Sequence, residues 1–169
     1  TAMSQGYIGY HLQQGILREL RLHKMPWHAV TVVTQVEVDL NDPAFENPTK
    51  PIGDFYTREQ ADALMAEDSK LQFKEDSGRG YRRVVASPKP IDIVEKDSIL
   101  ELLKKEFIVI ASGGGGIPVY KNEEGDYIGI PAVIDKDFAT AKLAELVNAD
   151  YLFILTAVDR VAVNFGTPE

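Results

Sequence analysis

The sequence predicts an α/β protein with a mostly parallel sheet. Three short apolar runs have the length and composition of buried strands: residues 29–36 (AVTVVTQV), 107–111 (FIVIA) and 151–156 (YLFILT). Amphipathic helical patterns separate these runs, and strands that alternate with helices are typical of parallel sheets. Because ligands of such sheets bind at the carboxyl ends of the strands, we expect the functional site in the loops that follow the runs.

The first helix is expected over residues 2–22. Four apolar side chains recur there at helical spacing on one face: Ile8, Leu12, Ile16 and Leu20. Three glycines interrupt the same stretch: Gly6, Gly9 and Gly15. Since glycine costs up to ~1 kcal/mol relative to alanine in a helix, we interpret these glycines as points of close packing against a neighbour. A ligand that passes close to the helix is the alternative.

A polar segment of residues 37–90 follows the first strand and differs from the rest of the chain. Proline, asparagine and glycine are frequent in its first part, and a short helix is expected at 58–67, started by Thr57 with Gln60 as a capping box. We expect residues 37–90 to form a protruding lid subdomain, with residues 1–36 and 91–169 as the core. Three arginines of this subdomain are interpreted as contacts to the core, with a solvated charge cluster as the alternative: Arg79, Arg82 and Arg83.

The second half of the chain continues the alternation of helices and strands. A helix capped by Asp97 or Ser98 precedes the strand at 107–111, and a further helix starts near Asp137. The apolar residues that these helices would bury are Ile99, Leu102 and Leu103 in the first and Leu143, Leu146 and Val147 in the second. Residues 122–126 (NEEGD) predict a hairpin-like turn, and residues 160–164 a short last strand.

The composition is that of an ordinary globular protein and argues against several functions. Among 169 residues the formal net charge is −8, whereas a nucleic-acid binder needs a basic face. There is no cysteine for a disulfide, a thiolate nucleophile or a metal site, and the three histidines lack metal-ligand spacing. No apolar run approaches the ~18 residues of a membrane helix. We therefore expect a cytoplasmic protein without nucleic-acid, membrane or protein-held metal sites, and a chain that is cut at both ends.

Four consecutive glycines follow the strand at 107–111 directly after Ser112: Gly113, Gly114, Gly115 and Gly116. They can be a flexible turn, or a backbone cradle in which N–H groups approach the oxygens of an anion. Flexible linkers usually extend further and recur with serine, so we favour the anion cradle. No Gly-Lys-Ser/Thr follows, which excludes a Walker A loop, and Pro118 excludes a dinucleotide fingerprint.

A second motif, Asp135-Lys136-Asp137, lies where a strand becomes a helix. Asp137 is readily explained as a helix cap. Lys136 is not, because a cation near a helix N-terminus is unfavourable by ~0.3–1 kcal/mol. The lysine is either a surface residue paired with its two aspartates or a group aimed at a phosphoryl group. These local residues favour neither alternative.

Taken in order, the motifs of the chain resemble those of the carbamate kinases, which belong to the amino acid kinases. The resemblance covers almost the whole chain. Its blocks are residues 4–10 (SQGYIGY), 47–53 (NPTKPIG), 78–90 (GRGYRRVVASPKP), the glycine loop with 117–119 (IPV), 132–139 (AVIDKDFA) and 154–159 (ILTAVD). The resemblance implies a three-layer αβα sandwich, a homodimer, and transfer of a phosphoryl group between ATP and carbamate or between carbamoyl phosphate and ADP, with Mg²⁺ on the nucleotide.

The resemblance also implies roles for single residues. Lys50 on the subdomain would reach the transferred phosphoryl group, Lys136 would contact the nucleotide phosphates, and Asp137 would orient the lysines. Ser112 and the four glycines would hold the carbamate or carbamoyl end. The residues implied in nucleotide binding besides Lys136 and Asp137 are Thr156, Ala157, Val158, Asp159, Val161 and Phe165. For Asp159, a place in a turn is the simpler alternative.

The chain departs from the family pattern in three respects. The first glycine loop of the family and its late lysine-bearing segment are missing, and Asp54 stands where the family often has proline. Two alternative functions therefore stay open. One is a catalytically inert fragment or partial nucleotide-binding module, and the other is a sibling amino acid kinase with another acceptor.

Overall fold

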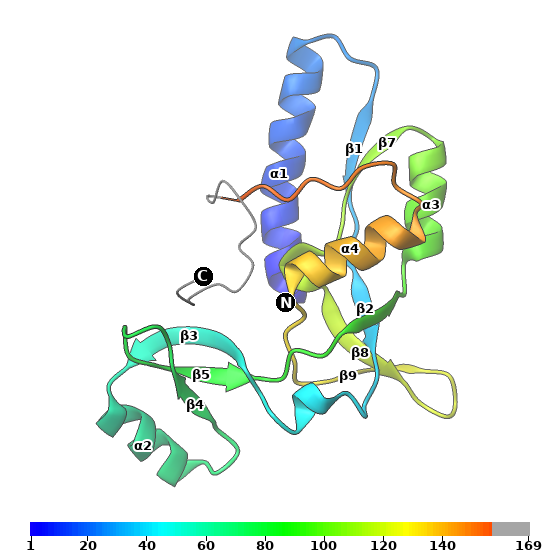
Figure 1. Ribbon diagram of the computed structural model, residues 1–169. Helices are drawn as coiled ribbons and strands as arrows, with labels where there is room; N and C mark the ends of the chain where they lie inside the picture. Colours follow the sequence, from blue (N-terminus) through cyan, green and yellow to red (C-terminus); the bar gives the residue numbers. More distant parts are fainter. Residues whose placement is uncertain (157–169) are drawn as a thin grey trace, which may run out of the picture.

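The computed structural model describes residues 1–156, and Figure 1 shows how its elements are arranged. In chain order the elements are α1 (Ala2–Leu22), β1 (His28–Thr31), β2 (Gln35–Val38), the 3₁₀ turn η1 (Pro43–Phe45), β3 (Lys50–Tyr56), α2 (Arg58–Glu67), β4 (Phe73–Glu75), β5 (Tyr81–Val85), β6 (Pro90–Ile93), α3 (Lys96–Lys104), β7 (Phe107–Ile110), the 3₁₀ turn η2 (Gly113–Gly115), β8 (Ile117–Lys121), β9 (Tyr127–Gly129) and α4 (Lys136–Leu146).

Two parallel strand pairs form the middle of the core. β1 pairs with β7, with Ala29 opposite Ile108, and β2 pairs with β8, with Val36 opposite Pro118. At the edges, β6 pairs with β2 and β9 pairs with β8, both antiparallel, which gives the order β6-β2-β8-β9. Parallel neighbours need a long crossover connection. Here the crossovers contain α3 and the whole subdomain.

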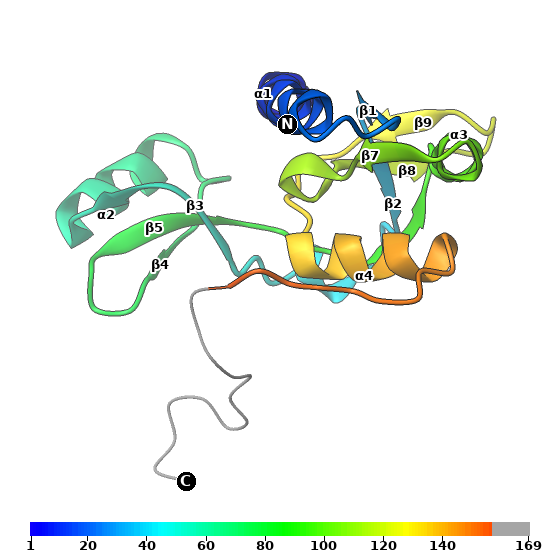
Figure 2. The same ribbon diagram turned by 90° about the horizontal axis from the view of Figure 1, so that it is seen from above.

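Helices cover both faces of these strands. Figure 2 shows α1 on one face and α4 on the other, with the strands between them. The predicted three-layer α/β fold is therefore confirmed. A cluster of buried apolar residues joins the strands to α3 and α4: Val36, Val38, Ile93, Ile99, Ile134 and Ala139. Full burial of a side chain as large as Val or Ile is worth ~1.5–3 kcal/mol, so this cluster is a main source of stability for the core.

A smaller antiparallel sheet of order β3-β5-β4 projects away from the core and carries α2 (Figure 1). The capping box at the start of α2 is confirmed. Thr57 N–H donates to Gln60 Oε1 at 2.9 Å, and Gln60 N–H donates to Thr57 Oγ1 at 3.3 Å. The boundaries 37 and 90 stay a prediction. In the structure β2 continues to Val38 and β6 begins at Pro90, so both core strands reach slightly into that range.

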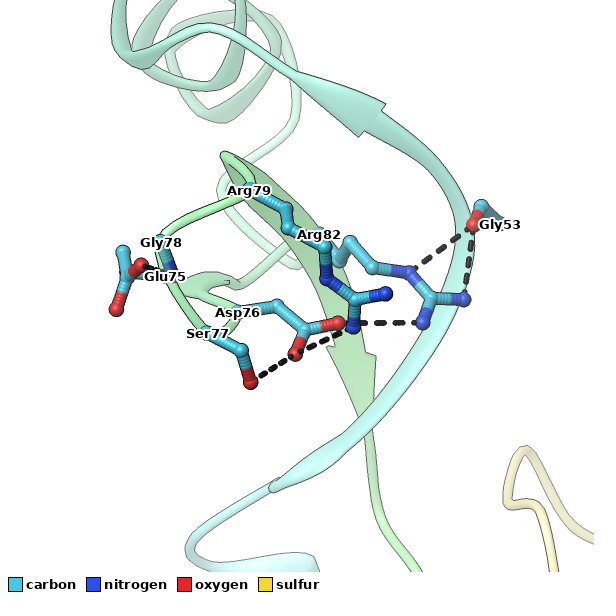
Figure 3. A network of polar contacts seen from close by, with 7 residues as sticks. All are labelled: Gly53, Glu75, Asp76, Ser77, Gly78, Arg79 and Arg82. Carbon is cyan, nitrogen blue, oxygen red and sulfur yellow. Dashed lines mark hydrogen bonds and ion pairs between the residues drawn. The ribbon is translucent and has the colours of Figure 1, made fainter. Parts of the chain in front are cut away.

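A polar network closes the hairpin of the subdomain (Figure 3). Arg82 donates from Nε and Nη2 to the Gly53 carbonyl at 3.1 and 2.9 Å, and from Nη1 to Asp76 at 3.3 Å. Arg79 donates to the same carboxylate at 3.4 Å, and both guanidinium groups lie over the ring of Phe55. The expectation of contacts to the core was wrong for Arg79 and Arg82, because they tie β3 to the β4–β5 turn within the subdomain.

Two expected features of the core differ in detail. The strand expected at 29–36 is broken, because Val32 to Thr34 separate β1 from β2. The helix α3 begins earlier than Asp97 or Ser98, with Glu95 as its N-cap and no side-chain capping bond. Asp97 instead lies in the first turn, where its negative charge suits the helix dipole.

The strand expected at 151–156 is not formed. These residues are extended without strand pairing and largely exposed, with Tyr151 at 80% and Leu155 at 97%. An apolar run becomes a strand only when a neighbouring strand satisfies its backbone groups. The strand expected at 160–164 lies outside the described residues.

The first helix forms over the expected residues, but only one of its glycines packs closely. A Cβ on Gly9 would lie 2.2 Å from Thr31 Cγ2 on β1, so α1 approaches β1 at this point. A Cβ on Gly6 or Gly15 would meet nothing within 4 Å among the described residues. The predicted apolar face is buried at Leu20, half-buried at Ile16 and exposed at Ile8 and Leu12.

Candidate functional site

The candidate site lies where both parallel strand pairs are interrupted, between β1 and β2 and between β7 and β8. Thr34 occupies the first interruption and is fully buried. Its hydroxyl accepts a hydrogen bond from Ser112 N–H at 2.9 Å. Gln5 of α1 binds the backbone of Thr34 twice, donating to its carbonyl at 3.0 Å and accepting from its N–H at 2.8 Å. The breaks in the two strands are therefore held together by buried polar contacts.

Sequence reasoning missed Gln5 and Thr34 as parts of this site. A lone glutamine in an amphipathic helix gives no local sign that it is buried. The useful signal was the block at 4–10, which carries the family resemblance and contains Gln5.

The glycine loop turns the chain sharply from β7 into β8. Ser112 begins the turn at φ 54°, and the N–H groups of Gly115 and Gly116 donate back to the carbonyls of Ser112 and Gly113 at 2.9 and 3.2 Å. Gly113 and Gly114 donate no hydrogen bond from their N–H groups within residues 1–156. These two N–H groups are the donors that remain for a ligand in the predicted anion cradle.

Packing explains the two other glycines. A Cβ on Gly115 would lie 2.1 Å from the carbonyl oxygen of Ile134, and a Cβ on Gly116 would lie 2.2 Å from Val36 Cγ2. Both residues also have a positive φ, of 91° and 87°, which side chains rarely adopt. The close approach of Gly115 to Ile134 brings the loop next to the start of α4.

The Ser112 hydroxyl is an unusual feature of this loop. Ser112 is buried, and its Oγ finds no hydrogen-bond partner among the residues that the structure describes. A buried hydroxyl without a partner costs roughly 1–3 kcal/mol. It is therefore a group that a bound ligand or water would stabilise.

The helix α4 begins at Lys136, two residues after Ile134, and is capped by Asp135, not by Asp137. Asp135 Oδ1 accepts hydrogen bonds from the N–H groups of Asp137 at 2.9 Å and Phe138 at 3.4 Å. The helix therefore starts near Asp137, as expected, but its cap is Asp135, two residues before the expected one. The burial of Ile134 in the core fixes where the strand-like segment ends, and the next polar residue becomes the cap.

Lys50 reaches Asp135 from the subdomain. Its Nζ lies 2.6 Å from Asp135 Oδ2, and the two side chains are 30% and 31% exposed. The hydrogen bond from the Lys50 ammonium lowers the pKa of the Asp135 carboxyl below its ordinary value, although partial burial opposes this shift. The structure thus brings Lys50, the start of α4 and the glycine loop together, as the motifs suggested, with Asp135 as the partner of the lysine.

The remaining candidate residues are placed less closely together. Lys136 and Asp137 are exposed, and neither side chain makes an ion pair within residues 1–156. Lys136 is therefore a surface lysine, as one alternative held, but it does not pair with its neighbouring aspartates within residues 1–156. Thr156 is exposed at the end of the described chain. Five nucleotide-site candidates lie outside the described residues: Ala157, Val158, Asp159, Val161 and Phe165.

The described residues also bear on metals and membranes. Within residues 1–156, no three His, Cys, Asp or Glu side chains come together as ligands of a metal ion. Among the helices of the same residues, none combines the length and apolar character that a membrane crossing requires.

The chain is thus an α/β protein with a glycine loop at the carboxyl end of a parallel strand, the position where such proteins bind ligands. It belongs to the amino acid kinase family, whose model matches residues 29–168. The resemblance of the motifs to this family is confirmed.

Known carbamate kinases are similar to the chain over nearly its full length. The carbamate kinase of Clostridium perfringens is 61% identical over 169 residues, which are 99% of this chain and 53% of the relative. The structure of carbamate kinase from Giardia lamblia bound to citric acid matches with a TM-score of 0.86 and 46% identity, over 97% of this chain and 52% of that one. The same enzyme bound to AMP-PNP matches with a TM-score of 0.83 and 46% identity, over 99% and 53%. The chain therefore spans about half the length of the relatives that it matches.

Proposed function

We propose that this protein is a phosphotransferase that moves a phosphoryl group between carbamoyl phosphate and ADP, and in reverse between ATP and carbamate. The observation that carries the proposal is the meeting of Lys50 with Asp135 beside the glycine loop. It places a cation at the start of α4, next to a loop in which two N–H groups make no hydrogen bond to residues 1–156. The 61% identity to a carbamate kinase supports this choice of substrate within the family.

The chemistry of phosphoryl transfer requires positive charge and positioning more than covalent help. Lys50 and the N–H groups of Gly113 and Gly114 would surround the transferred group, and Lys136 would contact the nucleotide phosphates. At ~4 Å and an effective dielectric of 20, each such charge pair is worth about 4 kcal/mol before desolvation. Asp137, exposed in the first turn of α4, would orient a lysine when the ligand is bound.

The nucleotide would enter as its magnesium complex. The ion would be held mainly by the phosphates of the nucleotide, as Mg²⁺ usually is in kinases. The bound ion would neutralise part of the phosphate charge.

A second candidate is a nucleotide-binding module without transfer activity. The observation in its favour is that the chain covers 53% of the length of its relative from Clostridium perfringens. The bound AMP-PNP in the similar enzyme from Giardia lamblia supports nucleotide binding in either case. We further propose that the protein is cytoplasmic and forms a homodimer, as the family resemblance implies. Sedimentation of the purified protein would test the homodimer.

ATP formation from ADP, Mg²⁺ and carbamoyl phosphate by the purified protein tests the proposal. We expect Lys136→Ala to lower turnover by ~10²–10³, the usual loss for one well-placed electrostatic donor. Lys104→Ala on α3 is the matched control, because Lys104 is exposed and pairs with Glu101 away from the loop. Full turnover by the Lys136 variant would refute its role. Absence of turnover together with ADP binding in a calorimeter would favour the nucleotide-binding module.

A further inference from the structure

The subdomain and the core are linked by few contacts. The backbone bond from Val133 N–H to the Ala86 carbonyl, at 3.0 Å, lies where the two chain segments leave the core. Further out, the ion pair between Lys50 and Asp135 connects the first residue of β3 with the cap of α4. Figure 1 shows the small sheet projecting from the core beyond this point. Together with Phe45, which packs against the core cluster, this ion pair is one of the side-chain contacts that can hold the subdomain in place.

Asp135 uses its two oxygens for two different tasks. Oδ1 accepts the N–H groups at the start of α4, and Oδ2 accepts the ammonium of Lys50. The cap keeps the carboxylate from rotating away, since rotation would leave the helix N–H groups unsatisfied. The capped carboxylate at the start of α4 thus fixes the position of the Lys50 ammonium, although Lys50 lies 85 residues away in the sequence.

Asp135 lies next to the candidate ligand site. The carbonyl of Ile134, the residue before Asp135, faces Gly115 in the glycine loop. An ammonium has three N–H donors, and Asp135 accepts one from Lys50 in the structure. The other two have no partner within residues 1–156 and could bind an anion beside the loop.

We propose that Asp135 is a positioning residue that holds Lys50, and with it the subdomain, at the start of α4 next to the glycine loop. Its consequence for catalysis rests on the proposed phosphotransfer, whereas its effect on the position of the subdomain does not.

The position of the subdomain can be measured directly. The sequence has no cysteine, so spin labels at Ala63→Cys on α2 and Glu101→Cys on α3 report one distance by pulsed electron paramagnetic resonance. We expect Asp135→Asn and Lys50→Met to broaden this distance distribution, with the displaced population rising about two- to fivefold, as expected for loss of a partly exposed ion pair. The double variant is expected to be no broader than either single variant, because both remove the same contact.

The choice of Asn separates positioning from capping. Asparagine caps helices as well as aspartate does, so the melting temperature of Asp135→Asn should stay within a few degrees of the parent. Asp92→Asn is the matched control, because Asp92 also accepts one lysine, Lys96, and one backbone N–H, and is 30% exposed, yet both of its partners lie in the core. Unchanged distances in both Asp135→Asn and Lys50→Met would overturn the proposal.

Turnover gives a second measurement. If the protein transfers phosphoryl groups, Asp135→Asn should lower kcat by roughly 10- to 100-fold with little change in the KM for ADP, since a small misplacement of a reacting group has an effect of this size. Equal kcat values for the variant and the parent would overturn the catalytic part of the proposal. A parent protein without turnover would defeat the proposed function instead, and the distance measurement would still decide whether Asp135 positions the subdomain.

Discussion

Replacing Gly115 by alanine gives the sharpest test of how the glycine loop is built. The new Cβ would lie 2.1 Å from the carbonyl oxygen of Ile134, whereas real Cβ atoms keep at least 3.0 Å from such atoms. The loop or the start of α4 must therefore shift by about 0.9 Å, the difference between these distances. Backbone on both sides makes this shift expensive, because no flexible side chain can give way.

The magnitude has two parts. A positive φ of 91° costs alanine ~1–2 kcal/mol, and overpacking of a close contact adds ~1–3 kcal/mol. Gly125 in the β8–β9 turn separates the two parts, because its φ is 92° but its Cβ would meet Lys121 Cε at an ordinary 3.8 Å. We expect Gly125→Ala to lose ~1–2 kcal/mol of unfolding free energy, and Gly115→Ala to lose roughly 2–5 kcal/mol.

Urea unfolding followed by far-ultraviolet circular dichroism gives both values. The reasoning is refuted if Gly115→Ala is no more destabilising than Gly125→Ala. That result would mean that the loop does not press against the start of α4, and the link between the loop and Asp135 would lose its structural basis.

Two further predictions concern α1 and Asp135. Gly9→Ala should destabilise the protein by ~1–3 kcal/mol through its contact with Thr31, and adding Thr31→Ala should relieve that loss. Gly15→Ala should instead stabilise the protein by up to ~1 kcal/mol. Thermal melting of the variants measures the loss and the gain in stability. Because the pKa of Asp135 is lowered in the folded state, its ion pair stabilises the protein above the ordinary value of ~3.9. That stabilisation should disappear as the pH falls through the lowered pKa, so urea midpoints between about pH 5 and 2 should fall less for Asp135→Asn than for the parent.

Features that a few neighbouring residues encode were predicted well. The helix at 2–22 follows from its periodicity, and the α2 cap follows from Thr57 and Gln60. The hairpin turn at 122–126 follows from Gly125, which adopts the expected positive φ. In each case the hydrogen bonds close within one turn, so the short-range sequence contains all the partners.

Choices that depend on distant contacts were not predictable in this way. Asp135 and Asp137 are equally good caps by composition, and the burial of Ile134 in the core decides between them. The same holds for Lys50, whose partner lies 85 residues further along the chain. For residues 151–156, apolar composition indicated a strand, yet a strand also requires a neighbouring edge to pair with. Apolar composition predicts that a segment tends to be buried, but it does not predict whether another strand lies beside it.

The glycine loop shows why a motif of four identical residues was ambiguous. Gly115 and Gly116 are explained by close contacts with Ile134 and Val36, so this half of the loop is a tightly packed turn and not the flexible turn that was one alternative. Gly113 and Gly114 donate no N–H hydrogen bond to residues 1–156, so the anion cradle stays a prediction for this half of the loop. A turn and a cradle can occur in one loop, because the close packing involves only the second pair of glycines. Substitution of Gly115 should therefore destabilise the protein through both its φ and its packing. Substitution of Gly114, where a Cβ would meet Thr1 at an ordinary 3.5 Å, should lose only the ~1–2 kcal/mol that a φ of 68° costs, and is expected to weaken ligand binding in addition.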